Sequence, residues 1–202
     1  MGAVGGAVSS FLFLLGAVAI SWLEQDFMDE LGWEVWPSGL ALGPRGWLQT
    51  ANFAVFGILL VGFALAVAAV PARRRAMTAA PVLLGVAGVA FVALVFETDP
   101  PDVDETWHGL LHGIAYLTWL GSILIAYPLT WWRVRRDAAW RDAPRWPSLL
   151  AALLFPPVLL LPDGESAGNY LFFAVVLTPL AVIAIRMAFA ALRAPTAPPS
   201  PG

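Results

Sequence analysis

Residues 47–70 read WLQTANFAVFGILLVGFALAVAAV, a run of 24 residues without a charged side chain. A helix needs about 20 mostly apolar residues, at about 1.5 Å each, to cross the roughly 30 Å hydrocarbon core of a membrane. This run meets both requirements. It predicts a membrane-spanning helix and so decides the class of the whole protein.

Five further segments are also mostly apolar, at residues 2–23, 77–96, 107–132, 147–162 and 169–192. The segment at 147–162 is the shortest. Pro156 and Pro157 remove two backbone donors from it, so we expect a bend there. The sequence therefore predicts an all-α fold: a six-helix transmembrane bundle forming one membrane domain over residues 1–193. A disordered, proline-rich tail is expected over residues 194–202.

The composition excludes several classes of protein. Of the 202 residues, 59% are hydrophobic and only 12% are charged, whereas soluble domains have about 25% charged residues. The absence of cysteine excludes disulfides, thiolate metal sites and cysteine nucleophiles. No soluble basic face is present, so we expect no nucleic-acid partner.

The charges of the loops divide between the two sides of the membrane. On one side lie twelve acidic residues and one arginine, a net charge of −11; on the other lie ten arginines and two acids, a net charge of +8. Arginine-rich short loops stay in the cytoplasm, which predicts that both termini are cytoplasmic. With no lysine and many alanines, glycines and prolines, the composition favours a prokaryotic cell membrane, where membrane lipid is the first expected partner.

The candidate site lies at the outer end of the segment 107–132. His108 and His112 are the only histidines, and their spacing puts them on one face of a helix, one turn apart. Two such imidazoles can bind one zinc ion, with Asp99 as the third ligand and Glu97 as the general base on a metal-bound water. Alternatively, the histidines form hydrogen bonds with loop carboxylates, or serve proton transfer or substrate binding.

The neighbouring segment 47–70 contributes two amides to the same end. Gln49 and Asn52 share one helical face, and polar groups at membrane depth are costly unless they pair. We therefore expect Gln49, Asn52, Asp99, His108 and His112 to form one connected cluster. Gly109 and Gly113 have the spacing that lets a second helix approach closely, and we expect that helix to be 47–70.

Three functions are compatible with this pattern to different degrees. We favour a non-catalytic membrane protein whose outer polar pocket binds a small ligand or lipid or supports a partner protein; it needs no cofactor. In this reading Gln49, Asn52, Glu97, Asp99, His108 and His112 line the pocket. The alternative is a metal-dependent intramembrane hydrolase, using zinc on His108, His112 and Asp99. A transporter is least favoured, because Thr118 and Ser122 are nearly the only polar residues near the midplane.

Three stretches resemble a known family: WPSGLALGPRGWLQTANFAVFGILL at residues 36–60, FETDPP at 96–101 and WHGLLHG at 107–113. They are similar to domain-of-unknown-function family 998, a prokaryotic family of multi-pass membrane proteins, over roughly residues 10–190. The layout also bears a distant likeness to the six-helix Frag1/DRAM/Sfk1-type proteins. The resemblance implies a multi-helix membrane fold and brings no assigned reaction.

Overall fold

The computed structural model describes residues 2–31, 36–71, 75–100, 103–135, 140 and 167–193. The predicted span at 147–162, with its bend at Pro156 and Pro157, and the predicted tail at 194–202 lie outside these described residues.

The described part of the chain is all-α, with six α-helices and two short 3-10 helices. Their bounds are α1 Gly2–Leu23, α2 Gln25–Leu31, η1 Gly39–Leu42, α3 Gly46–Ala69, η2 Arg75–Thr78, α4 Ala79–Ala93, α5 Trp107–Val134 and α8 Ala167–Arg193. Four of them (α1, α3, α5 and α8) are long and apolar enough to cross a membrane. They confirm the expected helices at 2–23, 47–70, 107–132 and 169–192 and indicate a multi-pass membrane protein.

The expected span at 77–96 differs from the structure. The α-helix covers only Ala79–Ala93, preceded by η2, and residues 94–96 form turns. At 1.5 Å per residue, its 15 residues extend about 22 Å, less than the roughly 30 Å of a hydrocarbon core. Hydropathy overestimated this helix because Leu94, Val95 and Phe96 are apolar but lie beyond the helix end.

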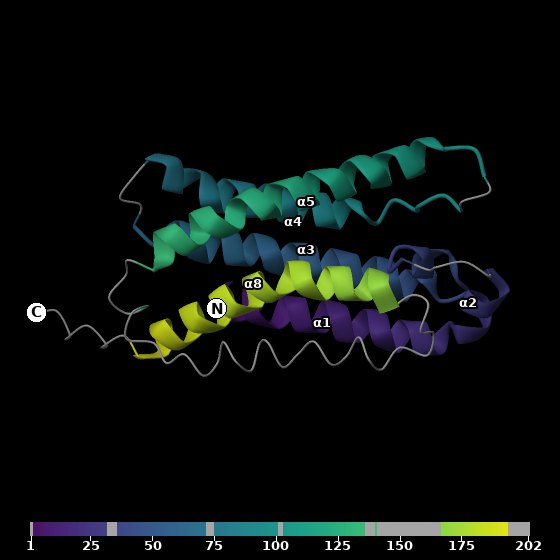
Figure 1. Cartoon of the computed structure of the whole chain (residues 1–202), viewed down its shortest axis with the longest axis horizontal. Helices are drawn as coiled ribbons and strands as arrows, with labels where there is room; N and C mark the ends of the chain where they lie inside the picture. The colour runs from purple at the N-terminus through teal and green to yellow at the C-terminus, as the bar shows by residue number, and fades with distance from the viewer. Residues whose placement is uncertain are drawn as a thin grey trace, which may run out of the picture.

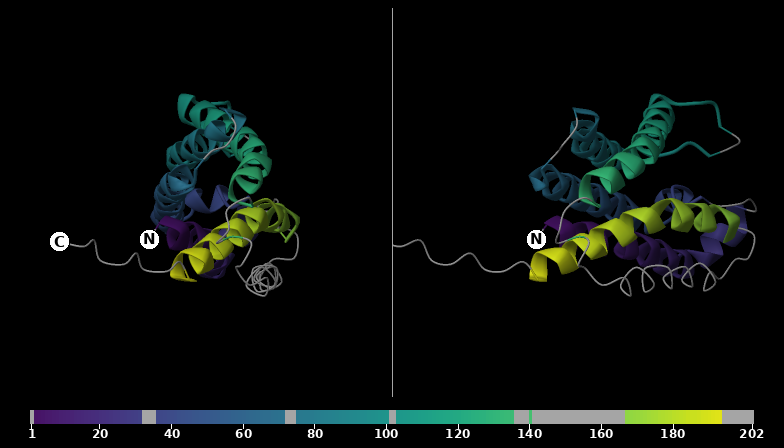
Figure 2. Two further views of the ribbon diagram at one scale, coloured as in Figure 1. Left: turned by 90° about the vertical axis from the view of Figure 1, so that its left-hand side faces the viewer. Right: turned by 60° about the vertical axis from the view of Figure 1, so that its left-hand side comes forward.

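The described helices α1, α3, α4, α5 and α8 follow an arc, and none of them closes it into a ring. Neighbours pack in the order α8, α1, α3, α4 and α5, whereas α5 and α8 meet only slightly. The end-on view in Figure 2 shows this arc, with α5 and α8 at its two ends. In Figure 1, α4 and α5 run antiparallel side by side, as their short connection predicts.

Aromatic side chains fill the inside of the arc. Phe91 of α4 lies 5.1 Å from Phe13 of α1, 4.3 Å from Phe56 of α3 and 5.1 Å from Trp119 of α5, measured between ring centroids. Trp119 stacks on Phe173 of α8 at 5.4 Å. Every helix of the arc thus contributes a ring to this aromatic core.

Small residues allow the closest helix contact. A Cβ built on Gly57 of α3 would lie 2.5 Å from the carbonyl oxygen of Gly88, and one built on Gly88 of α4 would lie 2.8 Å from that of Gly57. Such approach of two backbones is typical of membrane helices. The α3–α4 contact therefore requires glycine at both positions.

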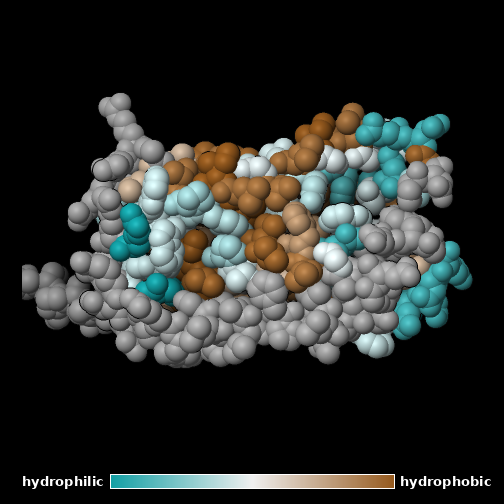
Figure 3. Space-filling model, viewed as in Figure 1, coloured by the Kyte–Doolittle hydropathy of each residue, from teal (hydrophilic) through white to brown (hydrophobic). Residues whose placement is uncertain are grey.

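The distribution of hydrophobic residues on the surface is the one expected of a membrane protein. On the face shown in Figure 3, hydrophobic residues cover much of the middle, and the most hydrophilic residues lie towards the two ends.

A buried arginine joins three elements at the end of the bundle where α5 finishes. Arg133 donates hydrogen bonds to the carbonyl oxygens of Ala68 at 2.8 Å, Val70 at 2.7 Å and Met77 at 2.9 Å. The last carbonyls of a helix have no partner within it, so this guanidinium satisfies the end of α3 and ties it to η2 and α5.

We expect Arg133→Ala to lower the free energy of unfolding by about 2 kcal/mol, because hydrogen bonds from charged groups are worth about 1.5–3 kcal/mol. Arg133→Lys should restore only part of the loss, since an ammonium lacks the planar fork. Thermal unfolding in detergent measures both. Arg135→Ala, which removes an exposed arginine two residues away, is the control; equal losses at both positions would contradict this role for Arg133.

Candidate functional site

A cavity of about 290 Å³ lies between α5 and α8, at the end of the bundle where both helices begin. Its lining residues come from the segment before α3, from α3, from the end of α4, from α5 and from α8. They are Trp36, Ser38, Phe53, Leu94, His112, Gly113, Tyr116 and Phe173. The cavity is therefore placed where the arc of helices is open.

The walls of this cavity are mostly aromatic and carry no charge. Trp36, Phe53, Tyr116 and Phe173 supply rings, and His112, Ser38 and the Tyr116 hydroxyl supply polar atoms. No arginine, aspartate or glutamate is among the described lining residues. An apolar pocket with a few polar groups is typical of small-molecule sites.

His112 is held by the backbone at the end of α4. Its side chain is 7% exposed, and its Nδ1 lies 2.7 Å from the carbonyl oxygen of Phe96. A carbonyl can only accept, so Nδ1 carries the proton and Nε2 of the neutral ring is left as an acceptor. The ring also packs against Phe53 of α3, with centroids 6.3 Å apart.

Asp99 and His108 are joined through Thr106, the N-cap of α5. Thr106 donates from its backbone nitrogen to Asp99 Oδ2 and from its hydroxyl to Asp99 Oδ1, both at 2.7 Å. The same hydroxyl accepts from the Gly109 backbone nitrogen and from His108 Nδ1, both at 3.2 Å. These bonds from the Thr106 backbone and side chain lower the pKa of Asp99 below its usual 3.8.

This arrangement does not assemble the expected zinc site. His108 and His112 turn their Nδ1 atoms to different partners, and Asp99 is committed to Thr106. Glu97 is exposed. Within the part of the chain that the structure describes, no three histidine, aspartate or glutamate side chains come together to hold a metal ion. The geometry gives no support to the hydrolase hypothesis.

Gln49 and Asn52 lie in a separate set of hydrogen bonds. Asn52 Nδ2 donates to the carbonyl oxygen of Phe13 in α1 at 3.0 Å and to Gln49 Oε1 at 3.3 Å. Gln49 is completely buried, and its Nε2 has no hydrogen-bond partner among the described residues. The expected polar cluster is thus divided: the amides face α1, and the histidines and Asp99 belong to the α4–α5 connection.

The prediction for Gly109 and Gly113 is wrong. A Cβ on Gly109 would lie 1.9 Å from Asp99 Oδ2, so this glycine makes room for a carboxylate and not for α3. A Cβ on Gly113 would meet no atom within 4 Å. The spacing of the pair is the same in both situations, and spacing alone does not distinguish a helix neighbour from a side-chain neighbour.

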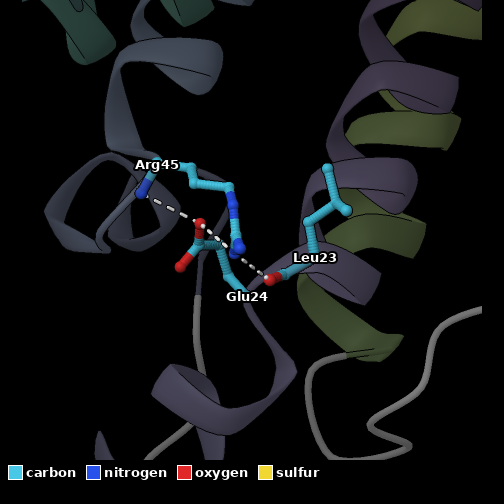
Figure 4. Close-up of polar contacts among 3 residues, drawn as sticks. All are labelled: Leu23, Glu24 and Arg45. Atoms are coloured by element: carbon cyan, nitrogen blue, oxygen red, sulfur yellow. Dashed lines mark hydrogen bonds and ion pairs between the residues drawn. The ribbon is translucent and has the colours of Figure 1, made fainter.

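A clasp of Glu24 and Arg45 holds the segment that carries Trp36 and Ser38 (Figure 4). The Arg45 backbone nitrogen donates to Glu24 Oε1 at 2.9 Å, and the Arg45 guanidinium lies 3.5 Å from the same oxygen. The guanidinium also donates to the carbonyl oxygen of Leu23, the last residue of α1, at 2.7 Å. Glu24 is only 2% exposed.

Sequence reasoning missed several residues of this site. Arg45 could have been paired with an acid, because it is the one base among the outer-loop acids. Thr106 carried the usual signal of an N-cap, a threonine directly before an apolar helix. The aromatic lining residues had no signal, because a ring beside a cavity and a ring in the core look alike in sequence.

Thr106→Val should destabilise the protein by about 1 kcal/mol, since it removes the N-cap hydroxyl while keeping the shape of the side chain. Thr106→Ser, which keeps the hydroxyl, should remain close to wild type. The unfolding temperatures of the two variants in detergent measure this difference. A Thr106→Ser variant as unstable as Thr106→Val would assign the effect to methyl packing instead.

Comparison with known proteins identifies the family and nothing closer. The family described as "Protein of unknown function (DUF998)" matches residues 7–190, which confirms the resemblance found in the sequence. No curated protein and no solved structure matches the chain. The chain belongs to the DUF998 family of proteins of unknown function.

Proposed function

We propose that this protein is a six-span protein of a prokaryotic cell membrane, with both termini in the cytoplasm, that binds an apolar ligand without catalysing a reaction. The cavity between α5 and α8 is the observation that carries this proposal. Its volume of about 290 Å³ is near the lower limit of small-molecule pockets.

The chemistry of the cavity favours a lipid-like ligand. Aromatic walls bind apolar groups well, and burying a charged group beside them without a partner would be costly. No described lining residue is an aspartate, glutamate or arginine that could form an ion pair with a ligand head group. Arg45 is already engaged with Glu24 and Leu23. An acyl or prenyl chain fits such a site better than a polar metabolite.

The positions of the helix ends support six spans. The Tyr170 hydroxyl lies 2.7 Å from Ser21 Oγ, so α8 begins beside the end of α1. Arg133 contacts the end of α3, so α5 finishes at the other end of the bundle. The end of α5 and the beginning of α8 therefore lie at opposite ends of the bundle, as expected if the chain crosses the membrane once more between them.

Cysteine labelling tests the orientation, because the natural chain has no cysteine. Val103, before the beginning of α5, and Pro71, after the end of α3, are both exposed. Figure 1 shows that α5 begins at one end of the bundle and α3 ends at the other. Val103→Cys should react with a membrane-impermeant thiol reagent in intact cells, whereas Pro71→Cys should react only after the cells are lysed. The opposite pattern would place the termini outside.

Photo-crosslinking tests ligand binding. Hexadecyl methyl ether with a diazirine in its chain should label the purified protein at residues that line the cavity. Gly113→Phe places a ring in open space at the cavity wall and should reduce labelling about tenfold, equivalent to roughly 1.4 kcal/mol of lost binding.

The matched control is Gly121→Phe. Gly121 also lies in α5, its Cβ would also meet no atom within 4 Å, and it does not line the cavity. Labelling should therefore remain as in wild type. Equal labelling of both variants, or labelling spread over the outer surface of the bundle, would contradict the proposed site.

A further inference from the structure

We infer that the ligand of this cavity carries a neutral hydrogen-bond donor, a hydroxyl group, which binds Nε2 of His112. This inference rests on the proposed function and adds the class of ligand: an apolar chain that ends in an alcohol. It follows from the hydrogen bonding of His112 and from the absence of charge in the described lining.

The tautomer of His112 is determined by its backbone partner. The Phe96 carbonyl lies beyond the last helical residue of α4, Ala93, and accepts the His112 Nδ1 proton at 2.7 Å. The other nitrogen of a neutral imidazole is an acceptor. His112 therefore presents an acceptor and needs a donor from its surroundings.

The protein does not supply that donor within the part of the chain that the structure describes. His112 Nδ1 is bonded to the Phe96 carbonyl, and its second backbone partner, the Leu94 carbonyl, is also an acceptor, so no described donor is bonded to Nε2. A polar atom left unpaired in an apolar site costs free energy. A ligand hydroxyl would satisfy Nε2 and could also pair with the hydroxyl of Ser38 or Tyr116.

An alcohol differs from most other lipid head groups because it carries no charge. A phosphate or carboxylate would bring a negative charge to a cavity without a basic side chain in its described lining. The negative charge would be desolvated without a counterion, which is strongly unfavourable. A quaternary ammonium could contact the aromatic rings, but it has no proton to donate to Nε2. The hydroxyl is the head group that matches the acceptor without this cost.

Competition against the crosslinking ether tests the inference on the wild-type protein. The competitors share one chain and differ only at the head: hexadecanol, hexadecyl methyl ether and hexadecyl phosphate. Hexadecanol should displace the probe at about tenfold lower concentration than the ether, equivalent to roughly 1.4 kcal/mol. Hexadecyl phosphate should compete no better than the ether.

The variant His112→Asn separates the two nitrogens. An asparagine amide nitrogen can take the place of Nδ1 and still donate to Phe96, but no atom replaces Nε2. The preference for hexadecanol should disappear, while displacement by the ether stays unchanged. In His108→Asn, which alters the histidine that does not line the cavity, the preference should persist.

The outcomes distinguish the two proposals. Equal competition by hexadecanol and the ether in wild type, or a preference that survives in His112→Asn, would overturn the hydroxyl inference and leave the cavity as an apolar site. Failure of the ether probe to label wild-type protein would remove the proposed function itself. The wild-type competition decides the inference even if His112→Asn does not fold.

Discussion

The fold depends on the contact of aromatic rings at the centre of the arc. Inside a membrane, lipid tails are as apolar as the side chains, so helices associate through close packing rather than through the hydrophobic effect. Edge-to-face and offset rings add about 0.5–1.5 kcal/mol per pair beyond burial of area. Phe91 brings the short helix α4 into contact with rings of α1, α3 and α5. Trp119 and Phe173 make the main aromatic contact across the opening between α5 and α8, and the cavity lies beside this pair.

The polar residues near the cavity form hydrogen bonds that hold the connection between α4 and α5. The backbone of the turn after α4 and the first turn of α5 have polar groups that need partners outside the helices. His112 satisfies the Phe96 carbonyl, and Thr106 satisfies the Gly109 amide while it is itself held by Asp99. This bond to Phe96, three residues beyond the last residue of α4, also determines which nitrogen of His112 is an acceptor. One side chain therefore both holds this connection and lines the cavity.

Hydropathy predicted the four long helices almost to the residue, because a membrane span must be both long and apolar. It overestimated α4, because apolar residues continue past Ala93 although the helix does not. Helical spacing correctly placed His108 and His112 on one helix, but it could not reveal that their partners are Thr106 and a backbone carbonyl. The cavity itself was not predictable, because it lies where α5 and α8, among the described helices, make few contacts with each other. Its aromatic residues have the same pattern as those of the core.

Because Asp99 contacts Gly109, the residues that positions 99 and 109 can accept depend on each other. With a Cβ at residue 109 lying 1.9 Å from the carboxylate oxygen, no chain with this loop conformation can have both an aspartate at 99 and a larger residue at 109. Substitution of the glycine must be accompanied by a shorter or displaced residue at 99, and the hydrogen bonds to Thr106 are then lost as well. Across related sequences, these two positions should covary, with each residue identity conditional on the other.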